Sequence, residues 1–420
     1  MRPVSAPHEA RTEAAEWGEG TVDQAELDSL PPDFAADPYP YYSCLRSADP
    51  VYLSPSGVWV LTRYDDVASV LRDPRFGRKG FQELLSLSNT DLMDSSLAPS
   101  MLFQDPPDHT RLRNLVSAAF TPRVTESLRL HIQQIVDGLL DRVLDARSMD
   151  LIADFAFPLP LCVICEMLGV PAADRPGLRQ WSLDIARRLD TTLAPLGSTA
   201  SARAMAAHDS LAVYFRGLIA ERRKHPQADL LTELVAAQVE GGILSESELL
   251  DVCGLLFVAG HETTVNLIGN GMLALLCHPM ELRKLHEDPG MLPSAVEELL
   301  RWDSPVQRVG RVANTDAEIG RKTIPKGAVV SLILGAANRD PAQFPEPDRL
   351  DITRRDNRHL AFGWGARYCL GAPLACVEGQ IAIGTLVRRL PKLELASDPP
   401  EWRNTIETRG LKELQVTFQV

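Results

Sequence analysis

Residues 362–371, FGWGARYCLG, place one cysteine, Cys369, in a loop that also holds three glycines. A thiolate is a strong, soft metal ligand, and a buried structural cysteine does not need a loop that bends so freely. Zinc fits poorly, because a structural zinc site usually takes four ligands in paired spacings, and no second pair follows Cys369 and Cys376. Cys162 and Cys165 form a C-x-x-C on an apolar helix, which favours a place in the core over redox chemistry.

Residues 259–264, AGHETT, place polar groups inside an apolar run that is predicted to be helical. Gly260 costs the helix about 1 kcal/mol but lets another group approach the backbone closely. Thr263 can bond back to the carbonyl of residue 259 and open the helix locally. Glu262 beside a hydroxyl suits a proton relay. A kinked core helix with a satisfied polar patch explains the same residues equally well.

Two further pairs of polar residues lie at helical spacing. Glu298 and Arg301, at i and i+3, can pair on one helix face, which by default is a surface ion pair worth about 0.3–0.5 kcal/mol. Glu297, at the third position of that helix, is predicted to cap it. His109 and Arg113, at i and i+4, either hold carboxylates or form a solvated basic face.

The element that must position AGHETT is a long apolar segment from residue 245 to 277. Ser245 and Glu248 form a capping box at its start, and it stops before Pro279. The pattern predicts one continuous helix of ~50 Å, long enough to cross a domain. Residues 191–210 are rich in small and polar residues and predict a flexible connection between helices, either a lid or a plain surface loop.

The remaining patterns predict a mainly α protein with small β-sheets, an α+β fold in a loose sense. Residues 109–300 are mostly helical by their apolar periodicity, whereas residues 51–73 indicate strand, turn, strand and helix. Beyond residue 300, β-branched runs predict further strands, and 338–357 an irregular meander. Residues 1–30 are expected to be a disordered tail, and 31–420 a single large domain.

Composition excludes several classes of protein. The 420 residues are 45% hydrophobic and 24% charged, as in a soluble globular protein. A net charge of -13 argues against nucleic-acid binding. The N-terminus lacks the apolar core of a signal peptide, and the longest apolar runs are shorter than the ~20 residues that span a bilayer. Seven scattered cysteines do not suggest a disulfide framework. We therefore expect a cytoplasmic monomer that does not bind membranes.

Together the motifs resemble the cytochrome P-450 family of haem-thiolate monooxygenases. FGWGARYCLG fits the haem-binding pattern F-x-x-G-x-R-x-C-x-G, AGHETT fits the oxygen-activating pattern [AG]-G-x-[DE]-T, and EELLR supplies E-x-x-R. The motifs occur in the family's order, and the resemblance spans residues 34 to 420. It implies the cytochrome P-450 fold, one large domain enclosing haem b around a long central helix.

The resemblance also implies residue roles. Cys369 would be the proximal thiolate ligand, which favours O–O cleavage, with Phe362 packed against its side. Gly260 would leave room over the haem, Thr263 would donate to dioxygen, and Glu262 would help to deliver protons. Positions that hold the haem propionates are matched by His109, Arg113, Arg311 and Arg367, with His359 as a further candidate.

Behind the haem, the resemblance implies a structural ion-pair network of Glu298, Arg301 and Arg349. Trp364 departs from the pattern, because bacterial relatives often have histidine there. It would either pack over the cysteine loop or line a partner surface.

The soluble bacterial type takes electrons from NAD(P)H through a separate flavoprotein reductase and a ferredoxin. The ferredoxin would dock on the proximal face, near basic residues such as Arg111 and Arg123. Substrate contacts would come from residues 77–104, 191–210, 255–259, 306–310 and 408–411. Most of these are apolar, apart from Gln307 and Arg308, which suggests a lipophilic substrate from natural-product biosynthesis.

Three alternatives stay open: a peroxygenase that uses hydrogen peroxide, a non-oxygenating P-450 that couples or dehydrates, and a haem sensor without turnover. The intact Glu262–Thr263 pair speaks against the peroxygenase, and a sensor would not need it.

Overall fold

The computed structural model of the chain describes residues 30–31, 33–79, 101–189, 198–241, 244–396 and 400–419. Its architecture is mainly helical with small sheets, which confirms the expected fold class. The predicted N-terminal tail lies outside the described residues, except for residue 30.

A run of helices spans residues 158–302, and the strands lie before and after it. The helices are α1 Tyr39–Ala48, α2 Tyr64–Arg72, α4 Asp108–Ser117, α5 Pro122–Ser127, α6 Arg129–Asp141, α7 Pro158–Met167, α8 Arg175–Leu189, α9 Ser198–Lys224, α10 Leu230–Gly241, α11 Glu246–Ala259, α12 Glu262–Cys277, α13 Pro279–Glu287, α14 Leu292–Trp302, α15 Leu334–Ala337 and α16 Ala372–Arg389. The strands are β1 Val51–Leu53, β2 Trp59–Leu61, β3 Phe76–Gly77, β4 Ser148–Asp150, β5 Arg308–Ala313, β6 Ala317–Ile319, β7 Lys322–Ile324, β8 Val329–Ile333, β9 Glu394–Leu395 and β10 Gln415–Thr417.

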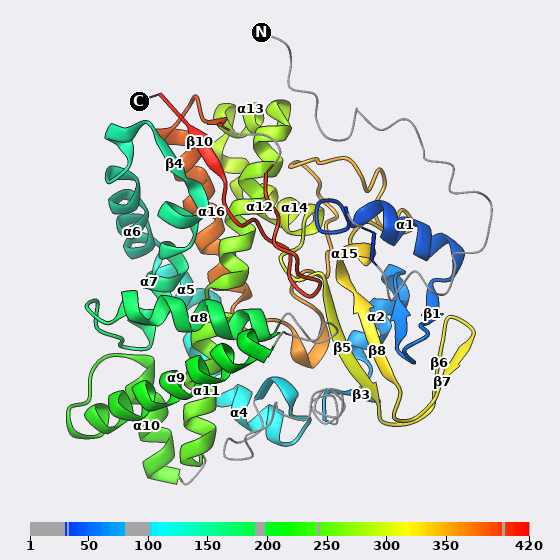
Figure 1. Ribbon diagram of the computed structural model, residues 1–420, viewed down its shortest axis with the longest axis horizontal. Helices are drawn as coiled ribbons and strands as arrows, with labels where there is room; N and C mark the ends of the chain where they lie inside the picture. Colours follow the sequence, from blue (N-terminus) through cyan, green and yellow to red (C-terminus); the bar gives the residue numbers. More distant parts are fainter. Residues whose placement is uncertain are drawn as a thin grey trace.

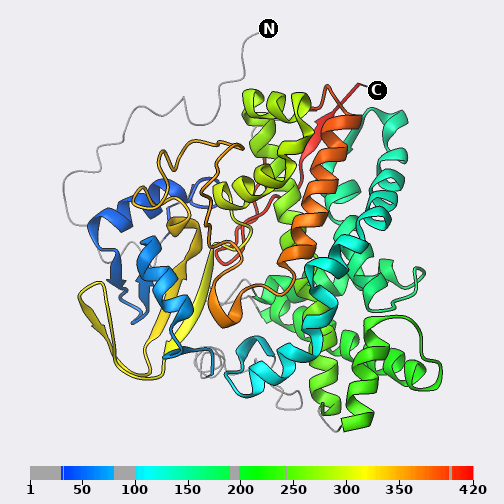
Figure 2. The same ribbon diagram turned by 180° about the vertical axis from the view of Figure 1, so that it is seen from behind.

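The five-stranded sheet has the order β1-β2-β8-β5-β3. Strands β2 and β8 pair in parallel, and the other neighbours are antiparallel. Figure 1 shows this sheet with α1 and α2 on one side of the molecule and most helices on the other. The loop before α16 lies between these two parts in both views (Figures 1 and 2). A three-stranded sheet, β4-β10-β9, has the C-terminal strand in its middle.

The segment 245–277 is not one continuous helix, as its sequence predicted, but two helices separated by a break. Ser245 and Glu248 do form the capping box that begins α11. Helix α11 ends at Ala259, and α12 begins at Glu262. The predicted bond from the Thr263 hydroxyl to the Ala259 carbonyl is present at 3.4 Å. One hydroxyl that competes for a carbonyl bends a helix, and further contacts described below turn the bend into a break.

The prediction of a flexible connection over 191–210 is wrong for its second half. Helix α9 begins at Ser198, so residues 198–210 are helical. Residues 191–197 lie outside the described part of the chain.

The stretch Glu246–Cys277, which holds α11 and α12, contains an 18-residue window apolar enough to cross a membrane by composition alone, with a mean hydropathy of 1.3. However, 67% of this window is buried inside the protein. A mostly buried helix of this kind is what the centre of a folded domain requires, and its burial gives no support to a membrane span.

Candidate cofactor and active site

The cysteine loop has a backbone that only glycine tolerates at two positions. Gly363 and Gly365 have φ values of 69° and 74°, in the left-handed region. A Cβ atom on Gly365 would lie 2.9 Å from the carbonyl oxygen of Leu71. The Cys369 N–H closes the loop by donating to the Phe362 carbonyl at 2.9 Å. The glycines thus fold the loop against α2 and fix where the cysteine emerges.

The thiol of Cys369 lies in an environment with opposing effects. The residue is accessible, but many protein atoms surround its sulfur, and this burial raises the pKa of the thiol. The N–H of Gly371, the guanidinium of Arg113 and the N–H of Ala372 lower that pKa. Groups that favour the thiolate are therefore in place around the sulfur, as a metal-binding cysteine requires.

The aromatic residues of the loop contact one another and the neighbouring core. The Phe362 ring lies 6.1 Å from the Tyr368 ring. Trp364 packs against the core beneath the five-stranded sheet, and the Arg72 guanidinium lies 5.2 Å from its ring centroid. Trp364 was expected either to pack over the cysteine loop or to line a partner surface. Its contacts with the core and with Arg72 favour a packing role.

A cluster of basic side chains surrounds the cysteine loop. His109 and Arg113 come from α4, Arg311 from β5, and Arg367 from the loop itself. Arg113 donates to the Tyr368 carbonyl at 2.6 Å. The predicted propionate-binding residues other than His359 thus come together here.

Sequence reasoning missed two members of this cluster. Arg78 donates to the Gly310 carbonyl at 3.2 Å, and Asp105 accepts from Arg367 at 2.6 Å. Asp105 lies four residues before His109 in the sequence, so its closeness to His109 could have been predicted. Arg78 follows β3, far from His109 in the sequence, and no local pattern linked the two.

Burial and the neighbouring guanidinium groups disfavour the charged forms of several members of this cluster. Burial lowers the pKa of Arg311 to about 10 and that of Arg78 to about 9, and neighbouring arginines add to both effects. Burial, with Arg367 and Arg113, lowers the pKa of His109 to about 4. Asp105 is the described carboxylate that acts on Arg78, His109, Arg311 and Arg367 alike. Such a set suits a ligand with two carboxylates, so thiol and cations together fit a haem.

His359 makes its hydrogen bonds to other residues than these cations. Its Nε2 lies 2.8 Å from Glu297 Oε2, and its Nδ1 accepts from the Ala361 N–H at 3.2 Å. The expected capping role of Glu297 is also wrong, because α14 begins after Met291 and that cap has no side-chain bond. Both ring nitrogens of His359 are thus engaged with other parts of the chain.

The Glu298–Arg301 pair is buried rather than exposed, with both side chains 0% accessible. Arg301 donates to Glu298 at 2.8 and 2.9 Å and also to the carbonyl oxygens of Asn338, Pro347 and Arg349. Such a pair holds the meander after α15 against α14.

The side chain of Arg349 is not the third member of this network, as expected, because it bonds to exposed Glu346. Arg349 contributes only its carbonyl. Arg354 takes the predicted place, with its Nε 3.1 Å from Glu298 Oε2.

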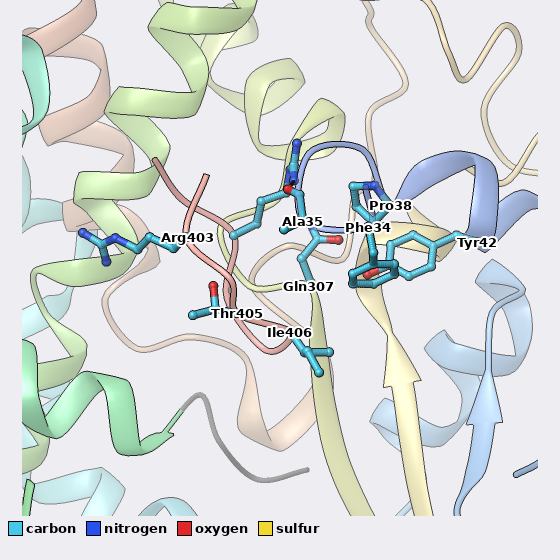
Figure 3. Close-up of a pocket in the computed structure, with 9 residues that line it drawn as sticks. Phe34, Ala35, Pro38, Tyr42, Gln307, Arg403, Thr405 and Ile406 are labelled. Carbon is cyan, nitrogen blue, oxygen red and sulfur yellow. Dashed lines mark hydrogen bonds between the residues drawn. The ribbon is translucent and has the colours of Figure 1, made fainter. Parts of the chain in front are cut away.

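The break between α11 and α12 is tightly packed. A Cβ atom on Gly260 would lie 2.6 Å from the Leu256 carbonyl oxygen and 2.9 Å from Ile164. Glu262, at the start of α12, accepts from Arg403 at 2.5 Å. Figure 3 shows Arg403 leaving the small pocket between residues 34–42 and 403–409 and extending toward the neighbouring helix. The predicted proton-relay acid is thus held in an ion pair with the C-terminal segment.

A buried acid on α16 was not predicted. Glu378 is 1% exposed, and burial raises the pKa of its carboxyl to about 8, an effect that Thr264 opposes. A glutamate within the apolar pattern of α16 was the only sequence signal.

We expect Glu378 to make the protein less stable as pH rises. The folded state keeps the proton up to about pH 8, whereas the ordinary pKa is 4.5, so between these values the folded state binds more protons than the unfolded one. Unfolding free energy should fall by roughly 1.4 kcal/mol per pH unit in this range. Glu378→Gln should remove this dependence in urea titrations at pH 5.5 and 7.5. Glu287→Gln, at an exposed site, should retain it; an unchanged slope in Glu378→Gln would contradict the assignment.

Comparisons with known proteins identify a family and several relatives. A family model described as Cytochrome P450 matches residues 290–411. The chain is 44% identical over 397 residues to the "Biotin biosynthesis cytochrome P450" of Bacillus subtilis strain 168, covering 92% of this chain and 98% of that protein. It is 42% identical over 405 residues to "Cytochrome P450 monooxygenase PikC" of Streptomyces venezuelae, covering 94% of each chain.

A solved structure shows the same arrangement of elements. P450BioI, in complex with hexadec-9Z-enoic acid ligated acyl carrier protein, is 43% identical and superposes with a TM-score of 0.83, covering 92% of this chain and 100% of that one.

Proposed function

Because this chain belongs to the cytochrome P450 family of monooxygenases and shares its fold, we propose that Cys369 binds the iron of haem b as a thiolate. The residues proposed to hold the haem carboxylates are the arginines Arg78, Arg113, Arg311 and Arg367 and the imidazole of His109, which would donate an N–H. The observation that carries this proposal is the meeting of an accessible cysteine with the buried guanidinium groups of Arg78 and Arg311 and with Arg113 and Arg367 at the same loop.

Residues near the cysteine loop and the break between α11 and α12 would contribute to the activation of dioxygen. When bound, haem supplies the activation of dioxygen, and a thiolate ligand favours O–O cleavage. The N–H groups of Gly371 and Ala372 stabilise negative charge on the sulfur. The Thr263 hydroxyl would donate a hydrogen bond to dioxygen and pass protons on to it. After leaving its ion pair with Arg403, the Glu262 carboxylate would take up a proton from water and pass it to Thr263.

The proposed source of electrons is NAD(P)H, through a separate reductase and ferredoxin. The test compares turnover driven by NADPH, ferredoxin and reductase with turnover driven by hydrogen peroxide alone. We expect NADPH consumption in the first assay and little substrate oxidation in the second. Turnover with peroxide alone would make the protein a peroxygenase.

We expect Thr263→Ala to divert electrons from substrate oxidation into hydrogen peroxide. The variant lacks the hydroxyl that passes protons, and removing a positioned proton donor typically costs about 100-fold or more. The ratio of peroxide released to NADPH consumed should therefore rise toward one. Thr263→Ser keeps a hydroxyl and should stay near the original ratio, so equal peroxide release by both variants would exclude the relay.

The proposed docking site for the ferredoxin is the surface on the proximal side of the cysteine loop. Arg111 is a weaker candidate than its sequence suggested, because it is paired with Glu248 and Asp108. Arg123 is exposed at the start of α5, and Arg72 lies beside Trp364. Charge reversal at Arg123 should slow reduction by the ferredoxin and weaken its salt dependence.

The proposed substrate is a lipophilic biosynthetic intermediate. The Bacillus subtilis relative is named for biotin biosynthesis, and the Streptomyces venezuelae relative is named a monooxygenase. The solved neighbour is in complex with an acyl carrier protein that carries a fatty acid. Arg308 lies in one of the predicted substrate-contacting segments, and its guanidinium pairs with Glu407 at 2.6 Å. Its positive charge is therefore already offset by a carboxylate of the protein. An uncharged or carrier-bound acyl or polyketide substrate therefore fits better than a free carboxylate. We also propose a cytoplasmic monomer.

A further inference from the structure

His261, in the break between α11 and α12, is fully buried and bonded through both ring nitrogens. Its Nδ1 lies 3.0 Å from the Phe257 carbonyl oxygen. A carbonyl can only accept, so Nδ1 carries the hydrogen. Its Nε2 lies 2.8 Å from Ser182 Oγ, so Nε2 accepts and the Ser182 hydroxyl donates. Ser182 is also 0% exposed.

The surroundings of His261 keep it uncharged. The rings of Phe157 and Phe257 lie 5.4 and 5.8 Å from the imidazole. Burial lowers the pKa of His261 to about 4, and Arg403 acts in the same direction. A buried, neutral ring with both nitrogens satisfied holds one orientation, so the imidazole is a rigid link and not a proton carrier.

The two ends of this link belong to different parts of the fold. Ser182 is on α8, which packs with α9 across α11 (Figure 1). Next to it, the Trp181 ring lies 6.4 Å from that of Tyr214 on α9. At the other end, the His261 carbonyl accepts the first backbone bond of α12, from the Val265 N–H at 2.9 Å. His261 therefore joins the outer helices directly to the start of α12.

We propose that His261 is a positioning residue that couples the placement of α8 to the break before α12. A shift of α8 reaches Glu262 and Thr263, the next two residues, through the Ser182–His261 bond. The inference rests on the proposed function for the roles of Glu262 and Thr263, but the mechanical link itself does not. Neither Ser182 nor His261 needs to touch substrate or cofactor.

Amide hydrogen exchange of the ferric, haem-loaded protein tests the link. Ser182→Ala should raise exchange about tenfold both in α8 and in residues 259–264, because loss of one bond loosens both ends. Ser210→Ala is the matched control, since the Ser210 hydroxyl bonds within its own helix α9, to the Ala206 carbonyl at 2.7 Å, and both segments should then exchange as in the original protein. Faster exchange confined to α8 in Ser182→Ala would overturn the proposal.

Two substitutions of His261 separate its two bonds. His261→Gln can place an acceptor near the Nε2 position and keep the bond to Ser182, whereas His261→Asn reaches only the Phe257 side. We expect Gln to preserve exchange at 259–264 and the yield of peroxide per NADPH, and Asn to raise both as Ser182→Ala does. Should Ser182→Ala not fold, this pair decides alone, and equal behaviour of Gln and Asn would overturn the proposal.

A double-mutant cycle supplies the last check. Adding Ser182→Ala to His261→Asn should change exchange at 259–264 no further, because the shared bond is already lost. Additive effects would mean that the two residues act separately, against the proposal. The carbon monoxide spectrum of the wild type tests the proposed function independently, so failure of one is distinguishable from failure of the other.

Discussion

The Cys369→Ser protein, reduced and exposed to carbon monoxide, is expected to lose the red-shifted absorption band that marks thiolate ligation. A serine hydroxyl is a hard, weakly basic ligand and cannot donate electron density to iron as sulfur does. Losing an outer partner of a metal ligand already costs about 10–100-fold in affinity or activity, so losing the ligand should lower substrate oxidation by more than about 100-fold.

Cys44→Ser is the matched control for this experiment. Cys44 is another exposed cysteine, but it lies on α1, away from the cysteine loop. This variant should keep both the band and the activity. A histidine-type spectrum in the unmodified protein, or an unaltered band in Cys369→Ser, would refute thiolate ligation by Cys369.

Arg301→Met is expected to lower the free energy of unfolding by about 3–5 kcal/mol, the usual cost of breaking a buried ion pair. The substitution leaves the Glu298 carboxylate buried and removes the donor from three carbonyl oxygens. Denaturant titration followed by circular dichroism, with haem absorbance in parallel, measures the loss. Haem should be released together with the protein's unfolding, because the network supports the meander leading to the cysteine loop.

Two neighbouring arginines test the corrected membership of this network. Arg349→Ala should change stability by less than about 0.5 kcal/mol, because its side chain is 59% exposed and pairs with exposed Glu346. Arg354→Ala should cost about 1.5–3 kcal/mol, the typical worth of a hydrogen bond to a charged group. The reverse order would restore Arg349 to the network.

The parts of the site that depend on local spacing were predictable from sequence. Glu298 and Arg301 are one helical turn apart, so their pairing needs no knowledge of the rest of the fold. The Ser245 capping box and the bond from Thr263 to Ala259 are local in the same sense, and both are present.

Partners chosen by tertiary structure were not predictable. Arg349 and Arg354 both follow the E-x-x-R helix in an irregular segment, and only the path of the backbone decides which guanidinium reaches Glu298. His359 is similar, because its partner Glu297 had an equally plausible local use as a helix cap. The helix break also depends on distant partners, since Arg403 and Ser182 hold its residues from other elements.

Secondary structure followed the same division. The strand–turn–strand of β1 and β2 was readable from its pattern, but the parallel pairing of β2 with β8 was not. Residues 198–210 were interpreted as flexible because they are small and polar. Alanine is the best helix former, and the alanines in this stretch belong to α9 because α8 and α11 give that helix a surface to pack on.

The central position of β10 in its sheet has a consequence for biosynthesis of the chain. β10 pairs with β4 on one side and with β9 on the other. A ribosome translates β4 long before β10, so this sheet must wait for residues 415–417 before it can close. Until then the edges of β4 and β9 stay unpaired, and exposed strand edges invite association between nascent chains. A premature stop a few codons before residue 415 would leave that state permanent, so loss of a very short C-terminal piece should harm folding in the cell out of proportion to its length.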